Sequence, residues 1–109
     1  MAKNINDTEL AIADRFFYVL DLLKSKRIIG GLYTFTRAHN INQGNMSVIY
    51  NHRDRYALKT EYLAFLAQDY GVSCEWLLLG NGEIFTPRSI VLKREREEAE
   101  AKARSSASA

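Results

Sequence analysis

Residues 32–51 read LYTFTRAHNINQGNMSVIYN, and this stretch predicts two short helices joined by a tight turn. Four apolar side chains recur at spacings that let two crossing helices share one small core. They are Phe35, Ile41, Met46 and Ile49. Asn40 stands between the two helices, where the chain must turn sharply. Asn is one of the few non-glycine residues that tolerate the left-handed backbone conformation of such turns.

The second helix of this stretch is expected to begin after Asn42, whose side chain is suited to cap it. With Met46 and Ile49 facing inward, the opposite side of the helix is uncharged and rich in amides. It carries Gln43, Gly44, Ser47, Val48 and Asn51. Such a face suits base edges in a DNA major groove, because Gln and Asn donate and accept hydrogen bonds at once and match adenine bidentately.

The stretch resembles the helix-turn-helix of the lambda-repressor-like superfamily, in particular the DNA-binding domain of phage CI-type repressors. Residues 41–47 resemble the family's turn and the start of its recognition helix, and residues 70–73 with 76–82 resemble a second segment typical of CI-type domains. The likeness runs from roughly residue 13 to residue 85. This chain departs from the family pattern with Thr36 in place of Ala, Asn40 in place of Gly, and His39 where an apolar residue is common.

The resemblance implies an all-α fold, a five-helix lambda repressor-like DNA-binding domain over residues 1–86, followed by a charged helical extension and disordered tail over residues 87–109. The implied function is that of a sequence-specific, double-stranded DNA-binding transcriptional regulator, a phage CI-type repressor-like protein. A homodimer on a two-fold-related site, with half-sites about one helical turn apart, is expected. The alternative is a helical protein-interaction module, antirepressor or antitoxin-like, without DNA binding.

The residues expected to contact DNA fall into two groups. The base-reading group is led by Gln43 and comprises Asn42, Gln43, Gly44, Asn45, Ser47, Val48 and Asn51. The phosphate group lies at the start of the first motif helix and in the loop after the second, and comprises Tyr33, Thr34, Arg53, Arg55, Tyr56 and Lys59. Arg53 and Arg55 lead it, because this loop lies along the DNA backbone in the fold that the chain resembles. The alternative for the loop is a solvated Arg–Asp pair of almost no energetic value.

Charge along the chain favours the same region. Residues 26–60 carry six basic side chains and one acidic one, whereas residues 61–85 carry four acidic side chains and no Lys or Arg. Such a local basic patch attracts a phosphate backbone even though the whole chain has a formal charge of only +2. The plainer interpretation is chance variation along a slightly basic sequence.

Flanking segments are expected to support the motif. Helices are predicted within residues 4–27, 59–70 and 74–79, with Gly71 ending the second and Ser73 capping the third. Trp76 is expected in the core and Cys74 as a small buried residue. Residues 84–85 are expected to fold back onto the domain or to meet a partner. Residues 88–103 read as a solvated helix that frays into a disordered 105–109 tail, with a dimer helix anchored by residues 90–92 as the alternative.

Composition argues against several other classes. The chain of 109 residues suits one domain, lacks an apolar run of about 18 residues and lacks a signal-peptide pattern before Asn4, so a cytoplasmic protein without a membrane segment is expected. One Cys rules out an internal disulfide. Two His, one Cys and no glycine-rich phosphate loop give no metal site, cofactor site or catalytic constellation, so no enzyme and no small-molecule substrate are expected.

Overall fold

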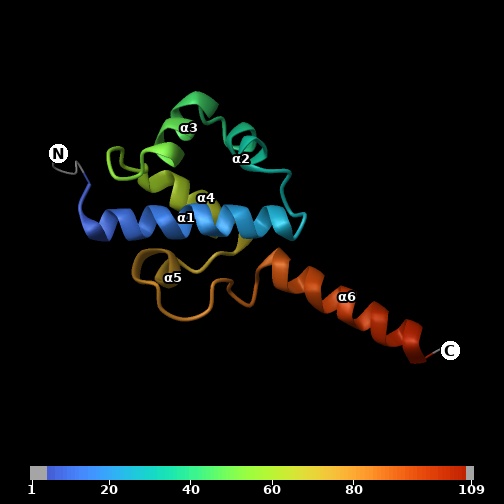
Figure 1. The fold of residues 1–109 in the computed structure, drawn as a ribbon. Helices are drawn as coiled ribbons and strands as arrows, with labels where there is room; N and C mark the ends of the chain where they lie inside the picture. Colours follow the sequence, from blue (N-terminus) through green and yellow to red (C-terminus); the bar gives the residue numbers. More distant parts are fainter. Residues whose placement is uncertain (1–4, 108–109) are drawn as a thin grey trace.

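The computed structural model describes residues 5–107, in which there are six α-helices and no β-strand. The helices are α1 (Asp7–Ser25), α2 (Leu32–Ala38), α3 (Gln43–Asn51), α4 (Thr60–Tyr70), α5 (Cys74–Leu79) and α6 (Ile90–Ala107). In Figure 1, α1 runs through the middle of the molecule, with α2 and α3 on one side of it and α5 on the other; α6 projects away from the body. The all-α expectation is confirmed.

The core is built around two adjacent phenylalanines of α1. Phe16 and Phe17 are almost completely buried and meet edge to face, with ring centroids 5.0 Å apart. Phe35 of α2 packs against Phe16 in the same way at 5.7 Å, an arrangement favoured by the ring quadrupoles. Met46 is fully buried and Ile49 is nearly so, as predicted for the inner face of α3. The helices α4, α5 and α6 add Leu66, Leu77 and Val91 to this core.

Local capping signals set most helix ends. The Asn6 side chain accepts a hydrogen bond from the Glu9 backbone N–H at 2.8 Å, and the Ser73 hydroxyl accepts one from the Trp76 N–H at 3.2 Å. Gly71 ends α4 in the left-handed conformation, with φ of 65°. These side-chain acceptors satisfy N–H groups that have no partner inside the helix. The three flanking helices predicted from the sequence are therefore present.

The segment after α5 folds back onto the domain, which is one of the two outcomes expected for it. The Ser73 N–H donates to the Ile84 carbonyl at 2.7 Å and the Thr86 N–H donates to the Gly71 carbonyl at 2.8 Å. Phe85 is thereby buried in the core. The Ser89 hydroxyl then donates to the Tyr70 carbonyl at 2.5 Å, which fixes the start of α6 beside the end of α4.

Two expectations about these flanking segments are wrong. Cys74 is exposed, because it is the first residue of α5 and α5 buries Leu77 instead. The C-terminal helix does not fray near residue 104 but continues to Ala107, since its Lys, Arg, Glu and Ala residues are good helix formers and no glycine or proline interrupts them. Residues 108–109 lie outside the described part of the chain. None of the helices in the described part is long and apolar enough to span a membrane.

Candidate nucleic-acid interface

The turn between α2 and α3 has a defined hydrogen-bonded geometry. Asn40 adopts the left-handed conformation with φ of 55°, as predicted. The Ile41 N–H donates to the Thr36 carbonyl at 2.8 Å and the Asn40 N–H donates to the Arg37 carbonyl at 3.4 Å. This pair of bonds is the Schellman arrangement, which satisfies the last carbonyls of a helix. It fixes the direction in which the chain leaves α2.

A substitution at the turn tests this geometry. Asn40→Gly is expected to leave the free energy of unfolding within about 0.5 kcal/mol, whereas Asn40→Val should lower it by about 1–2 kcal/mol, because a branched side chain is strained at positive φ. Chemical denaturation followed by circular dichroism measures both values. Equal stabilities for the two variants would contradict the left-handed turn.

Helix α3 presents an uncharged outer face, as the sequence predicted. Its N-cap is Asn42, whose side chain accepts a hydrogen bond from the Asn45 N–H at 2.9 Å. Gly44, Asn45, Val48 and Asn51 are exposed, with 43% of the Val48 surface accessible. The Asn51 amide nitrogen donates to the Ser47 carbonyl at 2.9 Å, which holds this exposed side chain against α3. We define the reading face as the outer face of α3, formed by residues 43, 44, 47, 48 and 51.

Gln43 lies at the edge of the reading face and is partly tethered. Its side-chain oxygen lies 2.6 Å from the Thr36 hydroxyl, and its nitrogen donates to the Ser47 hydroxyl at 3.2 Å. Thr36 is buried and its hydroxyl is also 3.0 Å from the Tyr33 carbonyl. These contacts fix the direction of the Gln43 amide while leaving part of its hydrogen-bonding capacity outward. Thr36 therefore has a positioning role that the sequence alone did not indicate.

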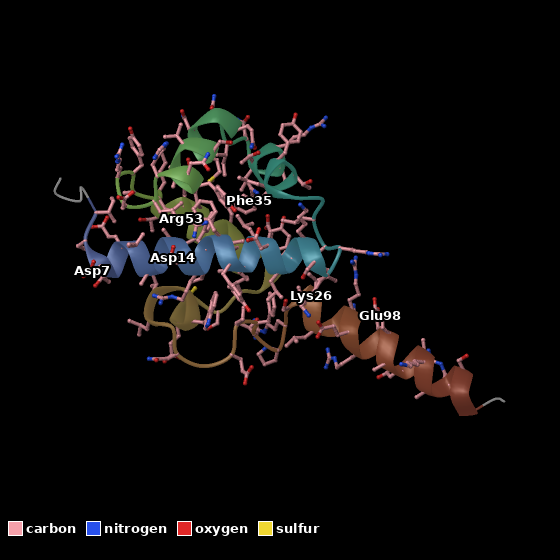
Figure 2. All side chains as sticks on the ribbon, viewed as in Figure 1. Asp7, Asp14, Lys26, Phe35, Arg53 and Glu98 are labelled. Carbon is pink, nitrogen blue, oxygen red and sulfur yellow. The ribbon has the colours of Figure 1, made fainter. Side chains whose placement is uncertain are left out.

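Arg53 is engaged within the protein instead of extending outward. Its guanidinium lies 3.0 Å from an Asp14 carboxylate oxygen and donates to the Tyr50 carbonyl at 3.2 Å. It also lies over the rings of Phe17, at 4.7 Å, and Tyr50, at 4.8 Å. Figure 2 shows Arg53 and Asp14 next to one another between the loop and α1. The expected phosphate contact of Arg53 stays a prediction, but its main visible role is to pin the loop after α3 to α1.

The contacts of Arg53 with Asp14, Phe17 and Tyr50 are expected to contribute measurably to the free energy of unfolding. Arg53→Ala is expected to lower the free energy of unfolding by about 1–2 kcal/mol, because it removes one ion pair and two cation–π contacts. Asp14→Ala should cost less, about 0.5 kcal/mol, since Asp14 is more exposed and loses only the ion pair. Denaturant titration of the two single variants and the double variant gives the coupling. Fully additive effects would contradict a direct Arg53–Asp14 interaction.

The other residues predicted to contact phosphates are exposed. Tyr33 and Tyr56 show 60% and 49% of their surfaces, and Thr34, Arg55 and Lys59 are also exposed. Within residues 5–107, the side chains of Arg55 and Lys59 make no hydrogen bond or ion pair. Lys59 and Tyr56 line a groove of about 300 Å³ against Asn45 and Val48 of α3. The structure thus brings Lys59 and Tyr56 beside the exposed side chains of α3.

His39 supports the end of α2, at a position where an apolar residue is common in the family that the sequence resembles. Its ring stacks on Phe65 of α4 with centroids 4.6 Å apart, and one nitrogen lies 2.5 Å from the Asp69 carboxylate. The other nitrogen lies 2.8 Å from the Phe35 carbonyl. Burial, and secondarily the Asp69 charge, raise the pKa of the nearby Tyr70 hydroxyl above its ordinary value of 10.0, so Tyr70 adds no charge to this contact. The helix pair is therefore held on α4 as well as on α1.

Two exposed residues of the helix pair, one on α2 and one on α3, were not singled out from the sequence. Tyr50 of α3 is 39% exposed and packs its ring edge on Phe17 at 5.1 Å. Arg37 of α2 is exposed and has no side-chain partner in the part of the chain that the structure describes. The position of Tyr50, seven residues after Gln43 on the same helix, is the signal that could have indicated it.

Comparison of this chain with protein-family models, curated proteins and solved structures finds no match. Its function is accordingly inferred from the geometry of its own residues. In the described residues, no group of three or more His, Cys, Asp or Glu side chains is placed to hold a metal ion.

Proposed function

We propose that this chain is a sequence-specific, double-stranded DNA-binding transcriptional regulator whose fold is lambda repressor-like and whose helix α3 enters the major groove. One observation carries the proposal. The reading face is uncharged and rich in amides, lies on a helix fixed by a tight turn, and has Lys59 beside it, a cation without a partner in the described part of the chain. Phosphate contacts position such a helix, and its amide and small side chains read base edges.

The roles of the residues follow from their placement. Gln43 and Asn51 carry amides at the two ends of the reading face and suit adenine, which accepts and donates in the major groove. Val48 presents methyl groups that suit the methyl of thymine. Arg55 and Lys59 lie in the loop between α3 and α4 and suit the phosphates beside the groove, as do Tyr33 and Thr34 at the start of α2. By occupying a promoter, the protein would block polymerase; bound beside one, it would activate instead.

A helical protein-interaction module remains a second candidate. The observation that favours it is the exposed apolar end of α5, where Leu79 shows 66% and Leu78 shows 45% of their surfaces. Exposed apolar side chains that adjoin one another mark contact sites for proteins. This surface lies across α1 from the reading face (Figure 1), so the two uses do not compete for the same residues.

Selection of duplexes from a random oligonucleotide pool tests the proposed function, and one substitution tests the leading base contact. Gln43→Ala should weaken binding to the selected duplex by about 1–3 kcal/mol and relax the base preference at one position. The reason is the loss of one bidentate contact without any change in phosphate contacts. Competition binding against duplexes with single base changes measures the effect. Unchanged affinity and preference would show that Gln43 does not read a base.

A further inference from the structure

Helix α6 leaves the domain with most of its surface uncovered. Its first turn is anchored by buried Val91, and Glu95 forms an ion pair with Lys26 of the turn after α1. From Lys93 to Ser105 every described residue is exposed. At 1.5 Å per residue the helix is about 27 Å long.

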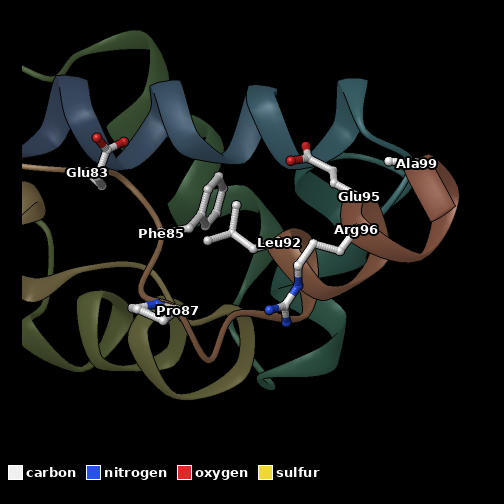
Figure 3. A pocket seen from close by; sticks show the side chains of 7 residues that line it. All are labelled: Glu83, Phe85, Pro87, Leu92, Glu95, Arg96 and Ala99. Carbon is white, nitrogen blue, oxygen red and sulfur yellow. The ribbon is translucent and has the colours of Figure 1, made fainter.

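A groove lies at the base of α6. It has a volume of about 550 Å³, and Phe85, Pro87 and Leu92 give it an apolar floor. Figure 3 shows Phe85 and Leu92 side by side at its centre, with Arg96 and Ala99 further along α6. We call this surface the α6 groove. It continues along the helix, because Leu92, Ala99 and Ala103 lie on one helical face.

We infer that a second copy of this chain covers the α6 groove by laying its own α6 antiparallel along the first. The charges beside the Leu92–Ala99–Ala103 face argue for this occupant. By the helical period, Glu95 and Lys102 flank one side of the face, whereas Arg96 and Glu100 flank the other. In an antiparallel pair with two-fold symmetry, each flank meets the same flank of the partner.

That geometry pairs opposite charges on both sides. Glu95 meets the partner's Lys102, and Arg96 meets the partner's Glu100, so symmetry gives four favourable contacts. A parallel pair would instead bring unlike flanks together and set Glu95 beside the partner's Glu100, which is repulsive. Within the described residues Arg96, Glu100 and Lys102 have no ion pair of their own, so they are available for a partner. Glu95 already pairs with Lys26, but only through Oε1, and its side chain is 46% exposed, so its second carboxylate oxygen can accept from the partner's Lys102.

Antiparallel pairing also fills the α6 groove. The outer turns of the partner helix reach back to the base of α6, where the small side chain of the partner's Ala103 allows close approach to Leu92. Burial of this apolar floor on association is favourable because it removes apolar surface from water. Since α6 lies across α1 from α3 (Figure 1), the reading face of each copy stays open. The inference does not depend on DNA binding.

Sedimentation equilibrium of the full chain without DNA tests the pairing. The natural sequence is expected to show a monomer–dimer equilibrium. Arg96→Glu and Glu100→Arg should each weaken dimerisation by about tenfold or more, because each change makes two of the four contacts repulsive. An equimolar mixture of these two variants should recover a dimer. One chain then carries Glu at positions 96 and 100 and the other carries Arg at both positions, so every contact between positions 96 and 100 joins opposite charges.

The mixture is decisive for the following reason. Each variant helix still carries like charges at positions 96 and 100, so any loss of helix stability persists in the mixture. Only opposite charges on the two different chains can restore the dimer. Glu97→Arg, on the side of α6 away from Ala99, is the matched control and should leave the dimer intact. Circular dichroism verifies that every variant keeps α6. A monomer at all concentrations, single variants that dimerise like the natural sequence, or a mixture that stays monomeric would each overturn the inference. Because DNA is absent, none of these outcomes is confused with failure of the proposed function.

Discussion

Val48→Glu is expected to weaken binding to duplex DNA by about a hundredfold while leaving the domain folded. Val48 is 43% exposed and lies on the reading face of α3, so a carboxylate there points at the surface that would meet the bases. Like charges brought together on binding cost several kcal/mol, because neither is paired and both lose water. The fold should be unaffected, since Glu is a better helix former than Val and the site is not in the core.

The matched control for this prediction is Val48→Gln, which has nearly the same shape as Glu without its charge. It should reduce affinity by about tenfold at most, through loss of the methyl contact alone. Fluorescence anisotropy with a selected duplex measures both variants, and thermal unfolding verifies that they are folded. If the Glu and Gln variants bind DNA as well as the natural sequence does, α3 does not face the duplex.

Gly71→Ala is expected to lower the free energy of unfolding by about 3 kcal/mol. Two causes combine at this position. The residue has φ of 65°, where a side chain is strained, and an added Cβ would lie 2.6 Å from the Ser89 Cα and 2.8 Å from the Ser89 Cβ. The backbone of the segment before α6 would have to move away, and the hydrogen bond of Ser89 to the Tyr70 carbonyl would be disturbed.

Gly82→Ala provides the matched control for the Gly71 prediction. Gly82 has a similar φ of 79°, but an added Cβ would meet no atom within 4 Å. It should therefore cost only about 1 kcal/mol, which is the conformational strain alone. Denaturant titration of the two variants separates strain from steric overlap. Equal losses of stability would mean that α4 and the start of α6 are not packed as closely as the structure has them.

The parts of the fold that depend on local chemistry could be predicted from the sequence. Asn6, Asn42 and Ser73 cap helices because their short polar side chains reach N–H groups three residues ahead. Asn40 and Gly71 mark helix ends because they accept positive φ. Each of these signals involves residues that are close together in the chain. The helical spacing of Phe35, Met46 and Ile49 in addition predicts which face of each helix is buried.

What escaped prediction involves residues far apart in the chain. Arg53 looked like a free loop cation, but Asp14, which holds it, is 39 residues away and only the packing of the loop on α1 brings them together. The contact of Thr36 with Gln43 depends on the angle between α2 and α3, which the sequence does not specify. Cys74 seemed a core residue by its type, yet its position at the start of α5 turns it to solvent.

The salt dependence of DNA affinity tests the central claim most directly. For a selected duplex, the logarithm of the association constant should fall linearly with the logarithm of salt concentration, by about 0.9 for each phosphate neutralised. Arg55→Ala should reduce this slope by about one phosphate, whereas Arg55→Lys should keep it. Failure to bind any duplex at low salt, or an affinity that does not change with salt, would contradict the account.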